Sequence, residues 1–443
     1  MHKLLPSLPE TVSLAAAAGK FKLARALMDK LLAGPLLPGM AQRLEFEKDR
    51  LERLRKAYPY DRAAALKILR KRLKNFRSSE LDGWIQAGYA APRLIDGREM
   101  FMDSFASNIV SCDRNKLVKR IKNPDKSGNA SFARLMARVE ELAAGAAPAR
   151  YRARARVTLT LNSAPKEKVR CWLPFPRVGD QVSSARLIAA SHKKYKLAKP
   201  GAEHRTIYME GRGRKFFAEF EYEVSEWVPA AGTAGPVPAA ARKYLAEEPP
   251  HIVFTPYARK LAAEIVGKEK DNYRKARRIY DWLTDNLTYN FTLPYGVFEN
   301  ISDYALTNLR GDCGFMALAF ITLCRAAGVP AKWQSGWAAR PGQAGSHDWA
   351  MFYAGCWRPV DVSFGRNRRV FKKEGQRRFY FGNLDGGRMV ANSELGAPLW
   401  PAKKFRRSDP TDNQRGEAET ASGNLYFDQV KTRIKLLAYE RLA

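Results

Sequence analysis

The most constraining feature of the sequence is an apolar run that has to be buried. From Gly314 to Ala327 nearly all residues are apolar, and the run predicts a helix inside a core. Gly328 suits the C-terminal cap of this helix, and Pro330 prevents the helix from continuing. The chain therefore contains a domain with a buried helix, and Cys313 stands at the first turn of that helix.

Cys313 has the position of a nucleophile. The unpaired N–H groups and the positive dipole end at the start of a helix favour a thiolate, which is the competent form of cysteine. The backbone N–H of Cys313 would also point toward an oxyanion formed on attack. Cys324 lies in the middle of the same helix among apolar residues, and we interpret it as a core residue.

A cysteine nucleophile needs a proton acceptor, and His347 is the one histidine of five that follows Cys313 in the sequence. It opens a strand-like run at 347–354, which Gly355 separates from a second run at 356–365. The two runs predict a hairpin with His347 and Asp361 near the same end. Asp361 could then orient the imidazole and stabilise the imidazolium. Each residue alone is more often structural, and only the joint arrangement favours catalysis.

The N-terminal third is predicted to be a helical domain over 1–145. Helices are expected at 40–57 and 61–76, the second capped by Asp61, and a two-strand turn is expected at Asp96-Gly97. The pattern looks faintly like a winged helix-turn-helix module with basic flanks, which would bind nucleic acid. A small helical domain that docks on its neighbour is the preferred interpretation.

The middle of the chain changes to strand periodicity after a linker at 144–150. Apolar and polar residues alternate in three runs, which predict a small antiparallel β-sandwich over 150–227. A second linker, at 228–241, precedes the catalytic core, which is expected over 251–435 together with a C-terminal extension. The three alternating runs are 153–161, 168–173 and 216–224.

The core is expected to open with helices over 251–287. One helix face carries an apolar stripe that should pack inward. Its members are Tyr273, Ala276, Tyr280, Leu283 and Leu287.

Charge and cysteine content bear on partners and compartment. The 77 lysines and arginines exceed the 45 acidic residues, and the formal net charge of +32 favours contact with a polyanion or an acidic surface. A generally basic surface without a dedicated partner explains the charge equally well. Five cysteines without a CxxC pair suggest neither a disulfide framework nor a zinc site, so we expect a cytoplasmic protein. We expect no signal peptide, no transmembrane segment, no calcium site and no cofactor.

The motifs around Cys313 resemble the transglutaminase core family. The matching features are Gly-Asp-Cys at 311–313, Ala-Gly-Val-Pro-Ala at 327–331, His347-x-Trp349 and Trp-x-Pro-Val-Asp at 357–361. The clear match covers 275–365, and a looser pattern that extends through 381–394 is similar to bacterial transglutaminase-like proteins.

This resemblance implies an α+β fold with a papain-like core and a triad of Cys313, His347 and Asp361. It also implies a thioester reaction, in which the thiolate attacks an amide carbonyl and water or an amine resolves the product. The family takes a second oxyanion donor from an aromatic residue before the cysteine, for which Tyr289 is the first candidate and Trp282 the second.

The sequence departs from the family at two positions. Gly314 follows Cys313 where cross-linking enzymes have Trp, and Met351 stands where many bacterial members have an acidic residue. Most of the tryptophans around the site are explained by core packing, but Trp337 and Trp349 are candidates for lining a substrate groove.

We therefore predict an enzyme that cleaves or exchanges an amide bond of a peptide or protein, with hydrolysis favoured over cross-linking. Acyl transfer of the arylamine acetyltransferase type is an alternative on the same core. The alternative from another class is a non-catalytic scaffold whose basic head binds nucleic acid or another polyanion. The sequence makes no prediction of oligomeric state.

Overall fold

The structure is a computed structural model, and it describes residues 6–124, 129–229, 236–365 and 374–442. It divides into two compact units. The first contains Met1–Asp125 and Thr288–Glu299, and the second contains Lys126–Leu287 and Asn300–Ala443. The predicted boundary at 145 is therefore too late, because helix α8 (Asn129–Ala143) packs on α15 (Glu374–Phe379) of the second unit.

The first unit is mainly helical, as predicted. Helix α3 (Met40–Ala57) has the predicted bounds, and α4 (Arg62–Arg72) begins after Asp61, whose side chain accepts a hydrogen bond from the Ala64 N–H at 2.9 Å. The other helices are α1 (Glu10–Ala17), α2 (Phe21–Leu32), α5 (Ser79–Gln86), α6 (Phe105–Cys112) and α7 (Arg114–Leu117).

A small sheet completes this unit. Its strands β1 (Tyr60–Asp61), β3 (Arg98–Phe101) and β2 (Arg93–Ile95) pair in that order. Asp96 and Gly97 join β2 to β3 with φ values of 46° and 81°, so the predicted two-strand turn is confirmed. The segment that returns at 288–299 contains β10 (Thr288–Tyr289) and places Val297 in the apolar core of this unit.

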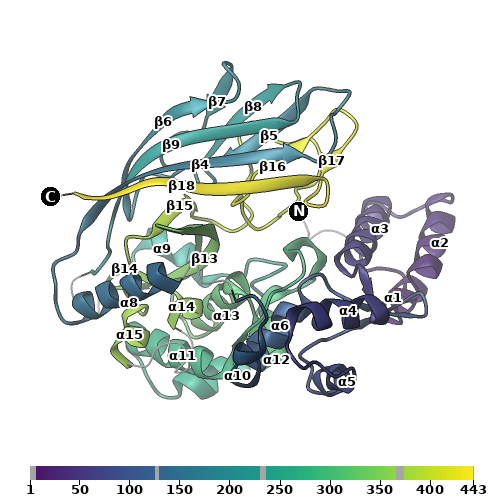
Figure 1. Ribbon diagram of the computed structural model, residues 1–443, viewed down its shortest axis with the longest axis horizontal. Coiled ribbons are helices and arrows are strands. Elements are labelled where there is room, and N and C mark those ends of the chain that lie inside the picture. The colour runs from purple at the N-terminus through teal and green to yellow at the C-terminus, as the bar shows by residue number, and fades with distance from the viewer. Residues whose placement is uncertain (1–5, 125–128, 230–235, 366–373, 443) are drawn as a thin grey trace. The chain divides into compact units, whose positions relative to one another are not determined.

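In the second unit, two antiparallel sheets form the predicted sandwich (Figure 1). One sheet has the order β18-β4-β9-β6 and the other has the order β17-β16-β5-β8-β7. The strands from the middle of the chain are β4 (Arg150–Leu161), β5 (Val169–Pro174), β6 (Val182–Ala190), β7 (Tyr195–Leu197), β8 (Thr206–Gly211) and β9 (Lys215–Ser225).

The C-terminus completes the sandwich, which corrects the predicted boundaries of 150–227 for the sandwich and 251–435 for the core. Strand β18 (Val430–Leu442) pairs with β4 along its whole length, and Figure 1 shows this yellow strand beside β4. β16 (Glu417–Glu419) pairs with β5 and with β17 (Asn424–Leu425). The edge of β4 is thereby covered by residues that lie 269 or more positions later in the chain.

Alternation in β9 follows the sequence pattern. Ala218, Phe220, Tyr222 and Val224 are at most 1% exposed and form part of the sandwich core. Glu219 lies on the opposite face but is also buried, because Arg154 and Arg156 of β4 pair with it.

The core is built around α13 (Cys313–Ala326), as predicted. Every residue from Gly314 to Arg325 is buried, and Gly328 follows the helix with a φ of 79°. The helix packs on a sheet of order β14-β13-β12-β15 and on three α-helices that precede it in the chain. These elements are β12 (Ala331–Arg340), β13 (Gln343–Ala354), β14 (Cys356–Val360), β15 (Arg388–Asn392), α10 (Pro256–Val266), α11 (Asn272–Asn286) and α12 (Ile301–Asn308).

Two further predictions about the core, the apolar stripe of α11 and the hairpin around Gly355, can be compared with the structure. Ala276, Tyr280 and Leu283 of α11 are buried as expected, but Tyr273 is 39% exposed although its ring contacts Phe381. β13 and β14 form the predicted hairpin, with Gly355 at a φ of 75° between them.

One apolar cluster joins the sandwich to the core sheet. Phe220 of β9 stacks on Trp337 of β12, with the ring centroids 5.6 Å apart. Part of the predicted linker at 228–241 lies outside the described residues. Within the described part of the chain, none of the helices has the length and apolar character needed to span a membrane.

Candidate active site

Cys313 is the first residue of α13, as the sequence predicts. Asp312 caps the helix, because its side chain accepts a hydrogen bond from the Phe315 N–H at 3.3 Å. Gly311 precedes the cap where any Cβ would run into the Phe315 side chain, so this position excludes larger residues. Cys313 itself is partly exposed.

His347 and Asp361 meet as predicted. The imidazole Nε2 and Asp361 Oδ2 lie 2.6 Å apart, and both side chains are almost fully buried. Asp361 follows β14 directly and caps the short helix α14 (Val362–Gly365). Its Oδ1 accepts hydrogen bonds from Ser363 Oγ and the Phe364 N–H, each at 2.9 Å. The carboxylate therefore holds both the imidazole and the turn that follows the hairpin.

A buried arginine completes this group, and the sequence analysis did not identify it. Arg388 of β15 is fully buried and pairs with Asp361 at 3.0 Å and with Asp385 at 3.1 Å. Its guanidinium also lies over the Phe364 ring, 4.4 Å from the centroid. Arg388 stands in the segment 381–394 of the looser family pattern, so its place in that segment was the available signal.

The electrostatics of this group follow from burial and opposite charges. Burial opposes ionisation of Asp361, but His347 and Arg388 outweigh it and lower the pKa of Asp361 to about 2. Burial lowers the pKa of His347, and the Asp361 carboxylate opposes that shift. The carboxylate is therefore ionised at neutral pH, and the neutral imidazole is ready to accept a proton.

Cys313 contacts Asp348 rather than His347. Its Sγ lies 3.2 Å from Asp348 Oδ2, and across the described ranges the structure records no hydrogen bond between Sγ and the imidazole. Neighbouring side chains on a strand point to opposite faces, so His347 and Asp348 cannot both face the sulfur in the same way. Of the three residues predicted as a triad, the structure joins His347 to Asp361, whereas Cys313 contacts Asp348, the residue after His347 on β13. The triad itself stays a prediction.

The ionisation of Cys313 also differs from the sequence expectation. Burial, followed by the charges of Asp348 and Asp312, raises the pKa of the thiol well above its ordinary value. These effects outweigh the N-terminal end of α13, which favours a thiolate. The state of the two carboxyls beside the sulfur therefore decides how readily it ionises.

Asp348 belongs to a second buried group. Gln414 Nε2 donates hydrogen bonds to Asp348 Oδ1 and to Asp412 Oδ2, the latter at 2.7 Å. Trp337 Nε1 donates to the Gln414 carbonyl at 2.7 Å, which ties this segment to β12. Asp348 was visible in the sequence as an acidic residue beside the candidate base, but Asp412 and Gln414 carry no local signal.

The two tryptophans predicted to line a substrate groove are core residues. Trp337 is 0% exposed and Trp349 is 1% exposed, and Trp349 Nε1 donates to Gln334 Oε1 at 2.5 Å. A fully buried ring offers no surface to a substrate, so the structure corrects this prediction. Both rings support the strands that carry the site.

The two oxyanion candidates lie on different units. Trp282 is half-buried on α11 of the second unit. Tyr289 belongs to the first unit, where its carbonyl accepts a hydrogen bond from Ser111 Oγ at 3.0 Å and its ring contacts Phe291. The role of either residue as an oxyanion donor stays a prediction.

The remaining cysteines and potential metal ligands do not add to the site. None of the five cysteines, all of which lie in the described ranges, forms a disulfide bond; Cys171 and Cys324 are buried, and Cys356 is exposed. Among the residues that the structure describes, no cluster of three or more His, Cys, Asp or Glu is arranged to hold a metal ion.

The comparison with protein families agrees with the sequence motifs. Residues 259–362 match the family model described as the transglutaminase-like superfamily. The matched segment runs from α10 into α14 and contains Cys313, His347 and Asp361. The core around the candidate site is therefore transglutaminase-like. No curated protein matches the chain.

Solved structures show weaker likenesses. A protein from Cytophaga hutchinsonii described as a "Putative Cysteine Protease" is 12% identical, with 67% of this chain and 90% of that chain covered and a TM-score of 0.41. The periplasmic domain of TgpA from Pseudomonas aeruginosa is 17% identical, with 51% and 91% covered and a TM-score of 0.29. At these identities and scores the likenesses support no conclusion about activity.

Proposed function

We propose that this protein is a thiol enzyme that cleaves an amide bond of a peptide or protein through a thioester. The observation that carries the proposal is the position of Cys313, which opens a buried helix and touches the strand whose His347 is held by Asp361. The match of this segment to the transglutaminase-like superfamily supports the same chemistry.

In the proposed reaction, Cys313 passes its proton to His347 and the thiolate attacks the carbonyl carbon of the substrate. The C–N bond breaks as the imidazolium gives its proton to the leaving amine, and a thioester remains on Cys313. Water then attacks the thioester while His347 accepts a proton from it. As the C–S bond breaks, the imidazolium returns that proton to the Cys313 sulfur, and a carboxylic acid is released. Catalytic hydrogen bonds often form fully only with substrate bound, so the Cys313–His347 contact belongs to that complex.

Hydrolysis is favoured over cross-linking because Gly314 follows Cys313 where cross-linking members of the family carry Trp. An amine that replaces water at the second step would give acyl exchange from the same thioester. The two outcomes share Cys313 and His347, so they are separated by product analysis and not by mutation of these residues.

The test is alkylation of native protein with iodoacetamide across pH 4–9, read for each cysteine by mass spectrometry. Exposed Cys356 provides a reference for an accessible thiol, and buried Cys324 reports loss of the fold. We expect Cys313 to label faster than Cys356 near neutral pH, and His347→Ala to remove that advantage because the proton acceptor is lost.

If Cys313 labels no faster than Cys324 and His347→Ala changes nothing, the proposed function is wrong. The matched control is His192→Ala. His192 stacks on Phe216 in the sandwich, so its loss should leave Cys313 labelling unchanged.

A second candidate function is a polyanion-binding scaffold, and one surface favours it. Arginines at 150, 152, 154 and 156 of β4 have side chains 41–57% exposed, and Lys435 and Arg433 of β18 lie beside them in register. Glu219 and Glu223 of β9 neutralise part of this row. Binding to a heparin column that falls steeply with salt, and that Cys313→Ala leaves unchanged, would support the scaffold.

A further inference from the structure

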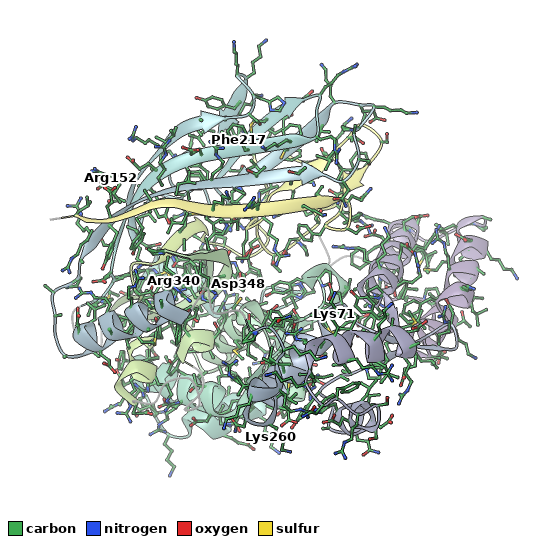
Figure 2. All side chains as sticks on the ribbon, in the orientation of Figure 1. Lys71, Arg152, Phe217, Lys260, Arg340 and Asp348 are labelled. Carbon is green, nitrogen blue, oxygen red and sulfur yellow. The ribbon has the colours of Figure 1, made fainter. Side chains whose placement is uncertain are left out.

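Asp348 is the side chain in hydrogen-bond contact with the candidate nucleophile. Its Oδ2 lies 3.2 Å from Cys313 Sγ, and the residue is 4% exposed. Figure 2 labels it among the elements of the core of the second unit. A carboxyl group at this position acts on the sulfur in one of two opposite ways, which depend on whether it carries a proton.

The Gln414 amide leaves one oxygen of Asp348 available for such a proton. Its Nε2 lies near three oxygens, namely Asp348 Oδ1, Asp412 Oδ2 at 2.7 Å and the His347 carbonyl at 3.5 Å. An amide nitrogen only donates, so Oδ1 of Asp348 is an acceptor. The oxygen left for an acid proton is Oδ2, which is the oxygen that faces Sγ.

The surroundings keep that proton in place. Burial, and then the charges of Asp412 and Asp312, raise the pKa of Asp348 well above its ordinary value. Burial and the charge of Asp409 raise the pKa of Asp412 to about 7, so Asp348 lies near a second carboxyl that ionises only around neutral pH.

The groups that face this pair come from several elements. The acidic charges dominate around Asp348, and Arg388 of β15 is a cation whose charge interacts with Cys313. The facing groups are Asp312, which caps α13, Cys313 of α13, Ser335 of β12, Asp409, Asp412 and Gln414 of the segment before β16, and His347 of β13 itself.

We propose that Asp348 is a catalytic residue of this site: its protonated carboxyl donates a hydrogen bond from Oδ2 to the Cys313 sulfur and stabilises the thiolate, and its ionisation silences the nucleophile. The inference rests on the proposed function, because it takes Cys313 as the nucleophile. Asp348 keeps its proton throughout, since the proton of the thiol goes to His347. No bond other than this hydrogen bond forms or breaks at Asp348.

The same contact explains why the thiol ionises with difficulty when Asp348 is charged. The Asp348 charge is the largest cause after burial of the raised Cys313 pKa. Protonation removes that repulsion and adds a donor to the sulfur, and a hydrogen bond to a charged group is among the stronger ones. The site is therefore active below the pH at which Asp348 ionises.

The experiment measures alkylation of Cys313 by iodoacetamide from pH 5 to 9 in the full chain, relative to Cys356, for three variants. Asp348→Asn is an isosteric copy of the protonated acid, because its oxygen can accept from Gln414 while its amide nitrogen donates to Sγ. Asp348→Ala removes the donor. Asp409→Asn removes a neighbouring charge without touching the sulfur. Protection of Cys171 and Cys324 confirms that each variant is folded.

In the wild type we expect the labelling rate to reach a maximum and then to fall as Asp348 ionises. Asp348→Asn should keep the maximal rate and lose the alkaline fall. Asp348→Ala should label roughly tenfold to a hundredfold more slowly at the maximum. Asp409→Asn should move the fall to lower pH, because a charge that keeps Asp348 protonated is gone.

Superimposable pH profiles for the wild type and Asp348→Asn would overturn the inference, and so would wild-type rates in folded Asp348→Ala. This failure is distinct from failure of the proposed function. In the first case Cys313 still labels fast and still depends on His347, whereas in the second it is unreactive in the wild type, and the inference falls with it.

Discussion

His347 and Asp348 are neighbours on β13, yet the buried carboxyl groups around them have pKa values shifted in opposite directions. On the His347 side, the ionised Asp361 is held by Arg388 at 3.0 Å, and opposite charges lower its pKa to about 2. On the Asp348 side, burial and like charges dominate, and the carboxyls of Asp348 and Asp412 are pushed toward protonation.

The difference indicates that the carboxyl groups near these two neighbouring residues have different chemical roles. An ionised carboxylate can orient an imidazole and stabilise its positive charge, whereas a protonated carboxyl can donate to a sulfur anion. Two carboxyl groups with pKa values moved in opposite directions by their surroundings are typical of sites with distinct acid and base roles. The following predictions break or sharpen this contrast, beginning with the largest effect.

Arg388→Met should lower the stability of the protein by removing the cation that pairs with Asp361. It leaves Asp361 and Asp385 buried without their shared cation, and such losses cost about 3–5 kcal/mol of unfolding free energy. Urea unfolding at pH 7 measures the change. The control is Arg378→Met, because Arg378 is 61% exposed and pairs with Glu374 on the surface, where a loss of at most about 1 kcal/mol is expected. Equal effects of the two substitutions would contradict the role given to Arg388.

Asp412→Asn should raise the stability of the protein at alkaline pH by removing a buried carboxyl group near Asp348. The folded pKa of about 7 lies above the unfolded value, so the wild type loses stability as the pH rises from about 4 through 7. The variant cannot ionise and avoids that loss. We expect a gain of up to about 4 kcal/mol at pH 8, at 1.36 kcal/mol for each pKa unit, and none at pH 4.

Thermal unfolding of both proteins at pH 4 and pH 8 measures the difference. A loss of stability at pH 8, or an equal shift at both pH values, would mean that folding does not raise the pKa of Asp412.

Two serines give the smallest and most closely matched comparison. Ser363 donates to the ionised Asp361 at 2.9 Å, and Ser335 donates to Asp412. Ser363→Ala should cost about 1.5–3 kcal/mol at every pH from 5 to 9, because its partner stays charged. The cost of Ser335→Ala should grow by about 1 kcal/mol between pH 6 and pH 8, as Asp412 ionises. Parallel pH profiles for the two variants would remove the contrast.

Several parts of the fold were predictable because their signals are local. The periodicity and the Asp61 cap predicted α3 and the start of α4, and the alternation in 153–161 and 216–224 predicted β4 and β9. Gly328 and Pro330 correctly predicted the end of α13. These features depend on neighbours within a few residues, which a single sequence displays directly.

The domain boundaries were less predictable because they depend on distant pairing. Lys431, Arg433 and Lys435 alternate with less polar residues, which indicates a strand, but nothing local shows that this strand covers β4. The same applies to α8, whose helical pattern was visible but whose packing on α15 was not.

The sequence by itself determined the chemistry available to this protein: Cys313 at a helix start, a hairpin that joins His347 to Asp361, and the transglutaminase-like motifs around them. Only the tertiary structure decided which charges surround each group. Arg388, Asp412 and Gln414 reach the site from segments 27 to 101 residues beyond Cys313 and Asp361. The buried Trp337 and Trp349 were likewise decided by the packing of the sandwich on the core sheet. Ionisation depends on burial and on charges brought together in space, and neither property is written in local sequence.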